Sequence, residues 1–167
     1  KRYGMVTVET KIINIHGSLK ETLEEEISEM QQLVIATASM PREDWARTRA
    51  FSWITAFLHF DKVLQIPIVL SRELCGIGYR EIFEAFLSDK TIRYPVLNDI
   101  KLFFFDKARD IQNGGAEYCH AAEWLDIFWP ADEFILIKLC VENKLDSFYA
   151  EAGDLLSEDR KSTRLNS

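Results

Sequence analysis

Cysteine is scarce in this chain of 167 residues, and the three that occur, Cys75, Cys119 and Cys140, lie far apart. A disulfide framework uses an even number of cysteines, and zinc or iron–sulfur sites use close pairs such as C-x-x-C. The sequence has neither pattern, which excludes a disulfide-stapled fold and a local cysteine metal motif. We expect three free, inert thiols.

Histidine is equally sparse, and His16, His59 and His120 are well separated in the sequence. The chain also lacks the glycine-rich phosphate loops, the G-x-S-x-G elbow and the H-E-x-x-H zinc motif. The sequence contains no recognisable pair of a nucleophile and a base, so a small hydrolase is a less favoured function than the others considered below. We assign no catalytic residue and no metal ligand.

Basic patches and long apolar runs are missing as well. The net charge is −7, whereas nucleic-acid binders usually carry a basic face, so we expect no nucleic-acid partner. The longest apolar stretches fall well short of the ~20 residues that span a bilayer. No signal-peptide pattern opens the chain. We therefore expect a cytoplasmic protein without a membrane span.

Hydrophobic residues make up 47% of the chain and aromatic residues 12%, which is enough for one domain with a sizeable core. The periodicity predicts a mainly α fold, a bundle of five or six helices preceded by one or two short β-strands. Residues 5–15 and 31–40 read as strands. Between them, a capping-box pattern at Ser18 and Glu21 predicts an acidic helix over 19–30.

The longest expected helix runs from 41 to 60 and is apolar nearly all round, which places it at the centre of the fold. Gly76 and the pair Gly114-Gly115 are expected to end helices. The aromatic connector over 116–130 reads either as a lid over the core, which we favour slightly, or as a pocket or partner surface. The further expected helices cover 66–75, 79–87, 95–112, 131–142 and 144–156.

Trp45, Arg49 and Trp53 are spaced by four and therefore share one side of the expected long helix. An arginine between two tryptophans is suited to cation–π contacts, or to clamping a carboxylate or phosphate of a ligand. We favour packing against a neighbouring helix, with the guanidinium turned outward.

His59 lies between aromatic residues on the same helix. We favour a core-edge histidine that is hydrogen-bonded to a carbonyl or carboxylate over a pocket residue that exchanges protons or binds a ligand. With Tyr79, these residues form the set of candidate substrate-binding positions. The set is Trp45, Arg49, Trp53, His59 and Tyr79.

Three segments, "SMPREDWARTRAFSW", "GIGYRE" and "WPADE", resemble the C-terminal region of cobalamin-binding radical SAM proteins. The first has Met40, Asp44-Trp45 and Arg47 where that family has a helix start of the form M-x-x-E/D-D-W-x-R/K. The other two match its GISYRE-like and W-P-P-D-E-like segments, and the resemblance covers most of residues 8–151. The resemblance is spread over these segments and does not rest on one short diagnostic motif.

The resemblance implies a parent enzyme with a [4Fe–4S] cluster, S-adenosylmethionine and cobalamin, often used for methyl transfer. In that family a C-x-x-x-C-x-x-C motif in a central barrel holds the cluster, and an N-terminal Rossmann-like domain holds cobalamin. Neither part is in this sequence, and none of its cysteines inherits the cluster role. The chain would be a C-terminal helical accessory region, inactive alone, whose partners are those missing domains of its parent.

On this interpretation, residues 1–40 hold the end of the barrel domain with a connecting strand and helix, and residues 41–158 form the helical domain. It predicts an apolar surface patch where the barrel docks. The alternative is a free-standing helical ligand-binding or protein-interaction module. That alternative predicts a deep pocket near Trp53, His59 and Tyr79.

Residues 159–167, "DRKSTRLNS", resemble the in-frame translation of a common sequencing adapter. We expect them to be non-native, with the natural chain ending at about Glu158 and Lys1 likewise marking the edge of a gene fragment. We expect this tail to be disordered or artificially extended, and to pack on nothing.

Overall fold

The computed structural model describes residues 3–13, 15 and 29–165, with side chains as far as 158. It is mainly α, with six α-helices preceded by two short antiparallel strands, so the predicted fold class is confirmed. In chain order the elements are β1 (Val6–Lys11), β2 (Met30–Ala36), α2 (Arg42–Thr55), the π-helix η1 (Ala56–Phe60), α3 (Gln65–Cys75), α4 (Tyr79–Leu87), the 3₁₀-helix η2 (Asp89–Arg93), α5 (Pro95–Gln112), β3 (Cys119–Ala121), β4 (Ile127–Trp129), α6 (Ala131–Val141) and α7 (Leu145–Leu165).

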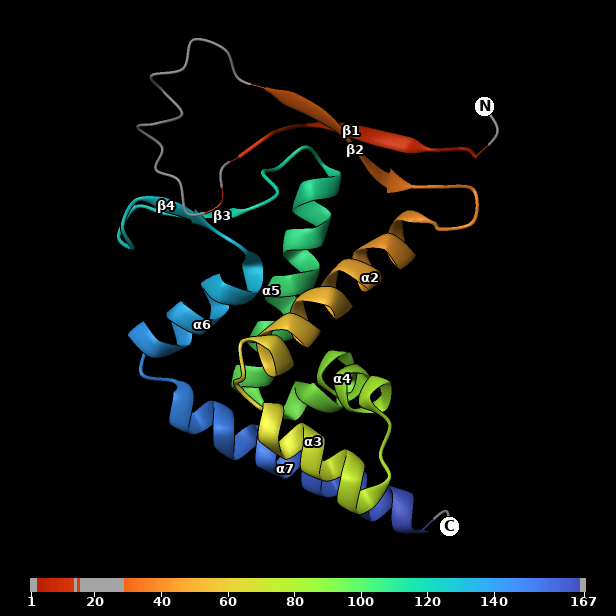
Figure 1. Cartoon of the computed structure of the whole chain (residues 1–167), viewed down its shortest axis with the longest axis vertical. Helices are drawn as coiled ribbons and strands as arrows, with labels where there is room; N and C mark the ends of the chain where they lie inside the picture. Colours follow the sequence, from red (N-terminus) through yellow and green to blue (C-terminus); the bar gives the residue numbers. More distant parts are fainter. Residues whose placement is uncertain (1–2, 14, 16–28, 166–167) are drawn as a thin grey trace.

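The molecule is elongated, and its two ends are built differently. Figure 1 shows the β1–β2 ribbon at the top, and α3 with α7 at the bottom. The helices α2 and α5 connect the two ends and pack on each other. The surface of the ribbon and the surface of α3 are therefore at opposite ends of the molecule.

The ribbon pairs β1 with β2 antiparallel, with Val8 opposite Leu33. The alternation of apolar and polar residues predicted the first strand, but that strand ends at Lys11 and the second at Ala36, four residues earlier than expected in each case. The predicted acidic helix over 19–30 falls mostly outside the described residues. Its last residue, Met30, opens β2 instead, because it pairs with Lys11.

The central helix is not α-helical to its end. α2 begins at Arg42, one residue later than expected, with Pro41 as its N-cap, and the last five residues of the predicted helix wind as the π-helix η1. The N–H of Asp61 donates to the carbonyl of Ala56, five residues back, at 2.9 Å. Such π segments often mark functional or crowded positions. Phe57, in this segment, is completely buried.

α5 covers 95–112 as predicted, with Pro95 as its first residue. Gly114 takes φ of 93°, and the N–H of Gly115 donates to the carbonyl of Asp110 at 2.9 Å, which ends the helix. A Cβ on Gly115 would lie 2.3 Å from the Asp110 carboxylate oxygens. Only glycine fits there without a shift of that carboxylate.

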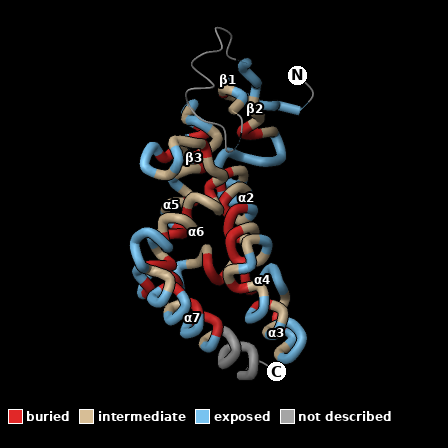
Figure 2. Tube along the Cα trace, turned by 60° about the vertical axis from the view of Figure 1, so that its left-hand side comes forward, coloured by how far each residue is buried: buried red, intermediate tan, exposed pale blue. Residues whose placement is uncertain are grey.

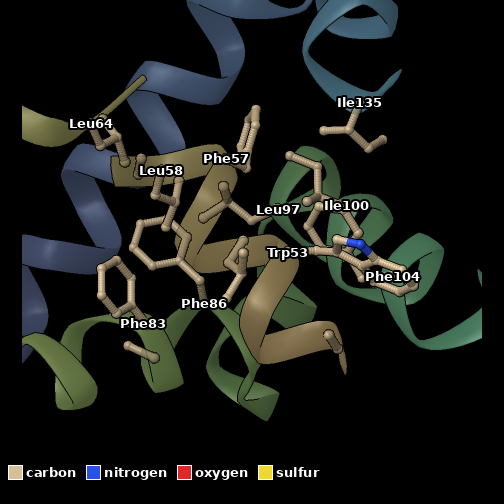
Figure 3. Close-up of a cluster of buried hydrophobic side chains, with 14 of the residues drawn as sticks. Trp53, Phe57, Leu58, Leu64, Phe83, Phe86, Leu97, Ile100, Phe104 and Ile135 are labelled. Carbon is tan, nitrogen blue, oxygen red and sulfur yellow. The ribbon is translucent and has the colours of Figure 1, made fainter. Parts of the chain in front are cut away.

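The core is centred on α2, η1 and α5, which confirms the predicted place of the long apolar segment. Figure 3 shows Trp53 beside Phe104, and their ring centroids are 5.9 Å apart. Phe57 meets Phe148 of α7 edge-on at 5.4 Å. Aromatic pairs of this kind add to the stabilisation from burial alone.

The aromatic connector is not a plain loop, because it contains the hairpin β3–β4. Trp124 lies in the turn of this hairpin, and its ring centroid is 4.9 Å from that of Phe134 of α6. The Phe134 ring in turn stacks on Phe103 of α5, with centroids 5.6 Å apart. The favoured interpretation of the connector as a lid over the core is therefore confirmed. The loop expected before Pro95 also gains structure, as η2.

α7 continues past its predicted end at Leu156 to Leu165, so the backbone of the tail extends the last helix that far. Leu156 is the last buried residue described, and Glu158 forms an ion pair with Arg93. Side chains after Glu158 lie outside the described part, so the absence of tail packing stays a prediction.

Within the described residues no single helix is both long and apolar enough to cross a membrane. Arg42–Phe60 and Gln65–Cys75 would meet that condition only as a pair, and the two are bent by 92°. The first of them forms the centre of the core described above.

Candidate functional site

Trp45, Arg49 and Trp53 share one face of α2, as predicted. The guanidinium carbon of Arg49 lies 5.1 Å from the ring centroid of Trp53 and 6.0 Å from that of Trp45. These distances are within the range of cation–π attraction, so the predicted stacking is confirmed. The two rings hold the guanidinium at a fixed place on the helix.

The expectation that this guanidinium turns outward is wrong. It forms an ion pair with Glu117, in the segment between α5 and β3, and the Glu117 side chain is only 14% exposed. Gln31 of β2 reaches the other carboxylate oxygen at 3.5 Å. Arg49 and Glu117 are 68 positions apart, so no local pattern could have identified the pair.

This cluster, Trp45, Arg49, Trp53 and Glu117, is a cross-link rather than an open anion clamp. Glu117 already occupies the guanidinium, and an anionic ligand would have to displace it. The pKa of Tyr118 beside it is raised, first by burial and then by the Glu117 charge. The Nε of Arg49 is buried and has no hydrogen-bond partner among the described residues.

His59 and Tyr79 form a second, separate group. Their ring centroids lie 6.3 Å apart in an edge-on arrangement, and Phe60 lies 5.2 Å from His59. The Nδ1 atom of His59 is buried and lacks a hydrogen-bond partner among the described residues. The expected carbonyl or carboxylate partner is therefore not found at this atom, because the ring lies among aromatic side chains.

Asp61, which follows η1, carries the most perturbed carboxyl described. Burial first, and then the charges of Asp132 and Glu133 in the first turn of α6, together raise its pKa from 3.8 to about 6. Burial also raises the pKa of Asp132. Sequence reasoning missed this cluster because its members lie about 70 positions apart. Among the described residues, no three potential ligands are arranged to hold a metal ion.

An open groove of about 570 Å³ runs between α2 and α4. Arg80 pairs with Glu84 at 3.0 Å, and Arg47 approaches the same carboxylate at 3.9 Å. The groove contains Tyr79 but neither Trp53 nor His59, so the deep pocket predicted near all three is not formed there. Its lining consists of Asp44, Arg47, Thr48, Phe51, Tyr79, Arg80, Phe83 and Glu84.

The three cysteines lie on α3, β3 and α6, and all are free. Burial raises the pKa of the Cys119 thiol to about 11, so this thiol stays protonated at neutral pH. That agrees with the inert role predicted for Cys119.

The five candidate residues thus divide between two places, the Arg49 cluster on one face of α2 and the His59–Tyr79 pair next to the groove. No protein-family model matches the chain, and a search of curated proteins finds no match.

Proposed function

We propose that the chain is the C-terminal helical accessory region of a cobalamin-binding radical SAM enzyme, a cytoplasmic and methyltransferase-like parent. Its role is to dock on the barrel of that enzyme and to brace the substrate side of the barrel's site. The chain contributes packing surface rather than reacting groups. The observation that carries the proposal is the unfinished β1–β2 ribbon.

The ribbon has free edges and an apolar surface. In the described part of the chain, β1 and β2 pair only with each other, so both outer edges present unpaired N–H and C=O groups. Two-stranded ribbons are marginal alone, and open edges attract further strands. Apolar side chains on and beside the strands are exposed: Met5, Val6, Ile12 and Met30. This is the kind of surface that a neighbouring domain covers.

The cofactors of such a parent do not fit this chain's own residues. Its cysteines are on three separate elements, and the buried Cys119 thiol is held protonated, whereas cluster ligands are thiolates. We therefore assign the [4Fe–4S] cluster, S-adenosylmethionine and cobalamin to the barrel and Rossmann-like domains of the parent.

The gene upstream of the Lys1 codon gives the direct test. The proposal expects a C-x-x-x-C-x-x-C motif in the same reading frame, within a domain of alternating strands and helices. A stop codon immediately upstream, or an upstream domain of another kind, would overturn the proposal.

A binding experiment then tests the docking surface. The upstream region is expressed as a separate chain, and its affinity for the 167-residue chain is measured by calorimetry. Val6→Lys should weaken binding by about tenfold or more, since a charge would enter a covered apolar surface. Val141→Lys is the matched control, because Val141 is also exposed, somewhat more than Val6, but lies on α6. If the two variants lower the affinity equally, the ribbon is not part of the interface.

A ligand-binding module is the second candidate, and the groove between α2 and α4 favours it. Its volume is in the range of small-molecule sites, and an aromatic floor lies beside two arginines that share one carboxylate. The probe is 1-anilinonaphthalene-8-sulfonate, an aromatic anion. Its fluorescence enhancement should fall in Tyr79→Ala and persist in Tyr149→Ala, a tyrosine of similar exposure elsewhere. Equal enhancement in both variants would discard this candidate.

A further inference from the structure

Helix α3 is apolar on the side that faces solvent. Ile66, Leu70 and Leu74 follow one another at intervals of four, so they form one ridge along the helix. Their exposures are 72%, 49% and 75%. Only Ile68, on the opposite side, is buried from this helix. A helix that is apolar on both sides is normally covered on both.

The position of α3 shows that the rest of the described chain does not cover this ridge. The helix lies at the lower end of the molecule in Figure 1, and Figure 2 colours most of it as exposed. Its main contacts are with η1 and α4, behind the ridge. The β1–β2 ribbon lies at the other end, so a contact made on the ribbon does not itself bury the ridge.

The pattern of the ridge is symmetric about its centre. Leu70 is half-exposed in the middle, and the two most exposed side chains, Ile66 and Leu74, lie one turn to either side. An antiparallel two-fold arrangement brings Leu70 against its own copy and Ile66 against Leu74 of the other copy. Each ridge then fits beside the other, as isologous interfaces require.

The charges on α3 suit the same arrangement. Glu73, seven residues after Ile66, borders the ridge near the C-terminal end of the helix. Antiparallel packing places this carboxylate beside the positively polarised N-terminal turn of the other α3, where no acidic residue lies in the first turn. A helix that lies on an anionic membrane would instead carry several lysines or arginines, and α3 has only Arg72.

We propose that two copies of this chain associate through the outward ridges of their α3 helices, packed antiparallel across a two-fold axis. The proposal does not rest on the proposed function, because the ribbon is not involved. A helix of this length is about 16 Å long, and one such face is smaller than the ~800 Å² per partner of standard interfaces. The dimer is therefore expected to be reversible, with Kd in the range of about 10–100 μM.

Sedimentation equilibrium of the full chain between about 1 and 300 μM, a span that brackets this Kd, tests the proposal. The wild-type mass should rise from monomer towards dimer. Leu70→Glu should remain monomeric over the whole range, because two carboxylates would meet on the axis. Leu102→Glu should dimerise like wild type, since Leu102 lies on α5 and is equally exposed, at 47%. Circular dichroism confirms that both variants are folded.

A charge exchange tests the antiparallel direction. Ile66→Lys and Leu74→Glu should each weaken the dimer, and the double variant should dimerise more tightly than either single variant, because the lysine of one copy meets the glutamate of the other. A wild-type chain that stays monomeric at every concentration overturns the proposal. So does a dimer that survives Leu70→Glu, a double variant weaker than both single ones, or a monomer that instead sediments with vesicles of phosphatidylcholine and phosphatidylserine.

Discussion

At the scale of single residues, the π-helix η1 separates two phenylalanines that look alike in the sequence. Phe57 is completely buried against Phe148, whereas Phe60 is 70% exposed. We expect Phe57→Ala to lower the free energy of unfolding by about 3–5 kcal/mol, through lost transfer energy and a residual cavity. Phe60→Ala, the control in the same element, should change it by no more than about 0.5 kcal/mol. Urea denaturation of both variants measures this.

Comparable losses in the two variants would contradict the π-helical register. In an unbroken α-helix, three residues at about 100° each turn the chain by about 300°. The two rings would then be separated by only about 60° around the axis, close enough for both to border the core. The π-turn is therefore the feature that this comparison tests.

Asp61 should make stability depend on pH in a defined direction. Its pKa rises from 3.8 to about 6 on folding, so the folded state holds a proton that the unfolded state has released in that window. The contribution of Asp61 to the free energy of unfolding is therefore fully present below about pH 4, and it is lost as pH rises through about 6. Asp61→Asn removes the effect.

The measurement is the melting temperature of wild type and Asp61→Asn from about pH 4 to pH 8, a range that covers the titration. The two proteins should melt alike near pH 4. The variant should become the more stable one as pH rises, and the difference should level off above about pH 7. A difference that does not vary with pH would show that neither burial nor the charges of Asp132 and Glu133 raise the pKa of this carboxyl.

At the scale of elements, Arg49 and Glu117 connect α2 to the segment before the hairpin β3–β4. Arg49→Met should cost about 1–3 kcal/mol, because Glu117 would remain mostly buried without its partner. Glu117→Gln should cost a similar amount. The double variant should cost less than the sum, and urea denaturation of all four proteins gives the coupling. Additive losses would show that the pair contributes no coupling energy.

The elements differ in how far the sequence predicts them. α5 is predictable from end to end because Pro95 opens it and two glycines close it, with a steady apolar period between. The hairpin β3–β4 is not, because three-residue strands are too short to show alternation. The π-turn at Ala56 also leaves no local signal, and the contacts of η1 with α6 and with Phe148 of α7 are made between segments distant in sequence.

At the scale of the whole molecule, the same limit applies to the candidate site. Spacing by four places Arg49 between its tryptophans, which is a property of one helix. Its partner Glu117, and the acidic group around Asp61, depend on how helices distant in sequence cross. Sequence patterns describe the geometry of residues that are close in the chain. They can therefore indicate one partner of a contact, such as Arg49, but not the distant partner that the fold brings to it.

The end of α7 bears on which residues the whole domain needs. Its buried side chains stop at Leu156, and Glu158 makes the last described ion pair. Removal of 159–167 should therefore leave the free energy of unfolding unchanged within about 0.5 kcal/mol. Removal of 145–167 should prevent folding, because Phe148, Ala152 and Leu155 are completely buried. Urea denaturation and circular dichroism measure both. A loss above about 1 kcal/mol from the shorter deletion would show that the tail packs on the domain and belongs to it.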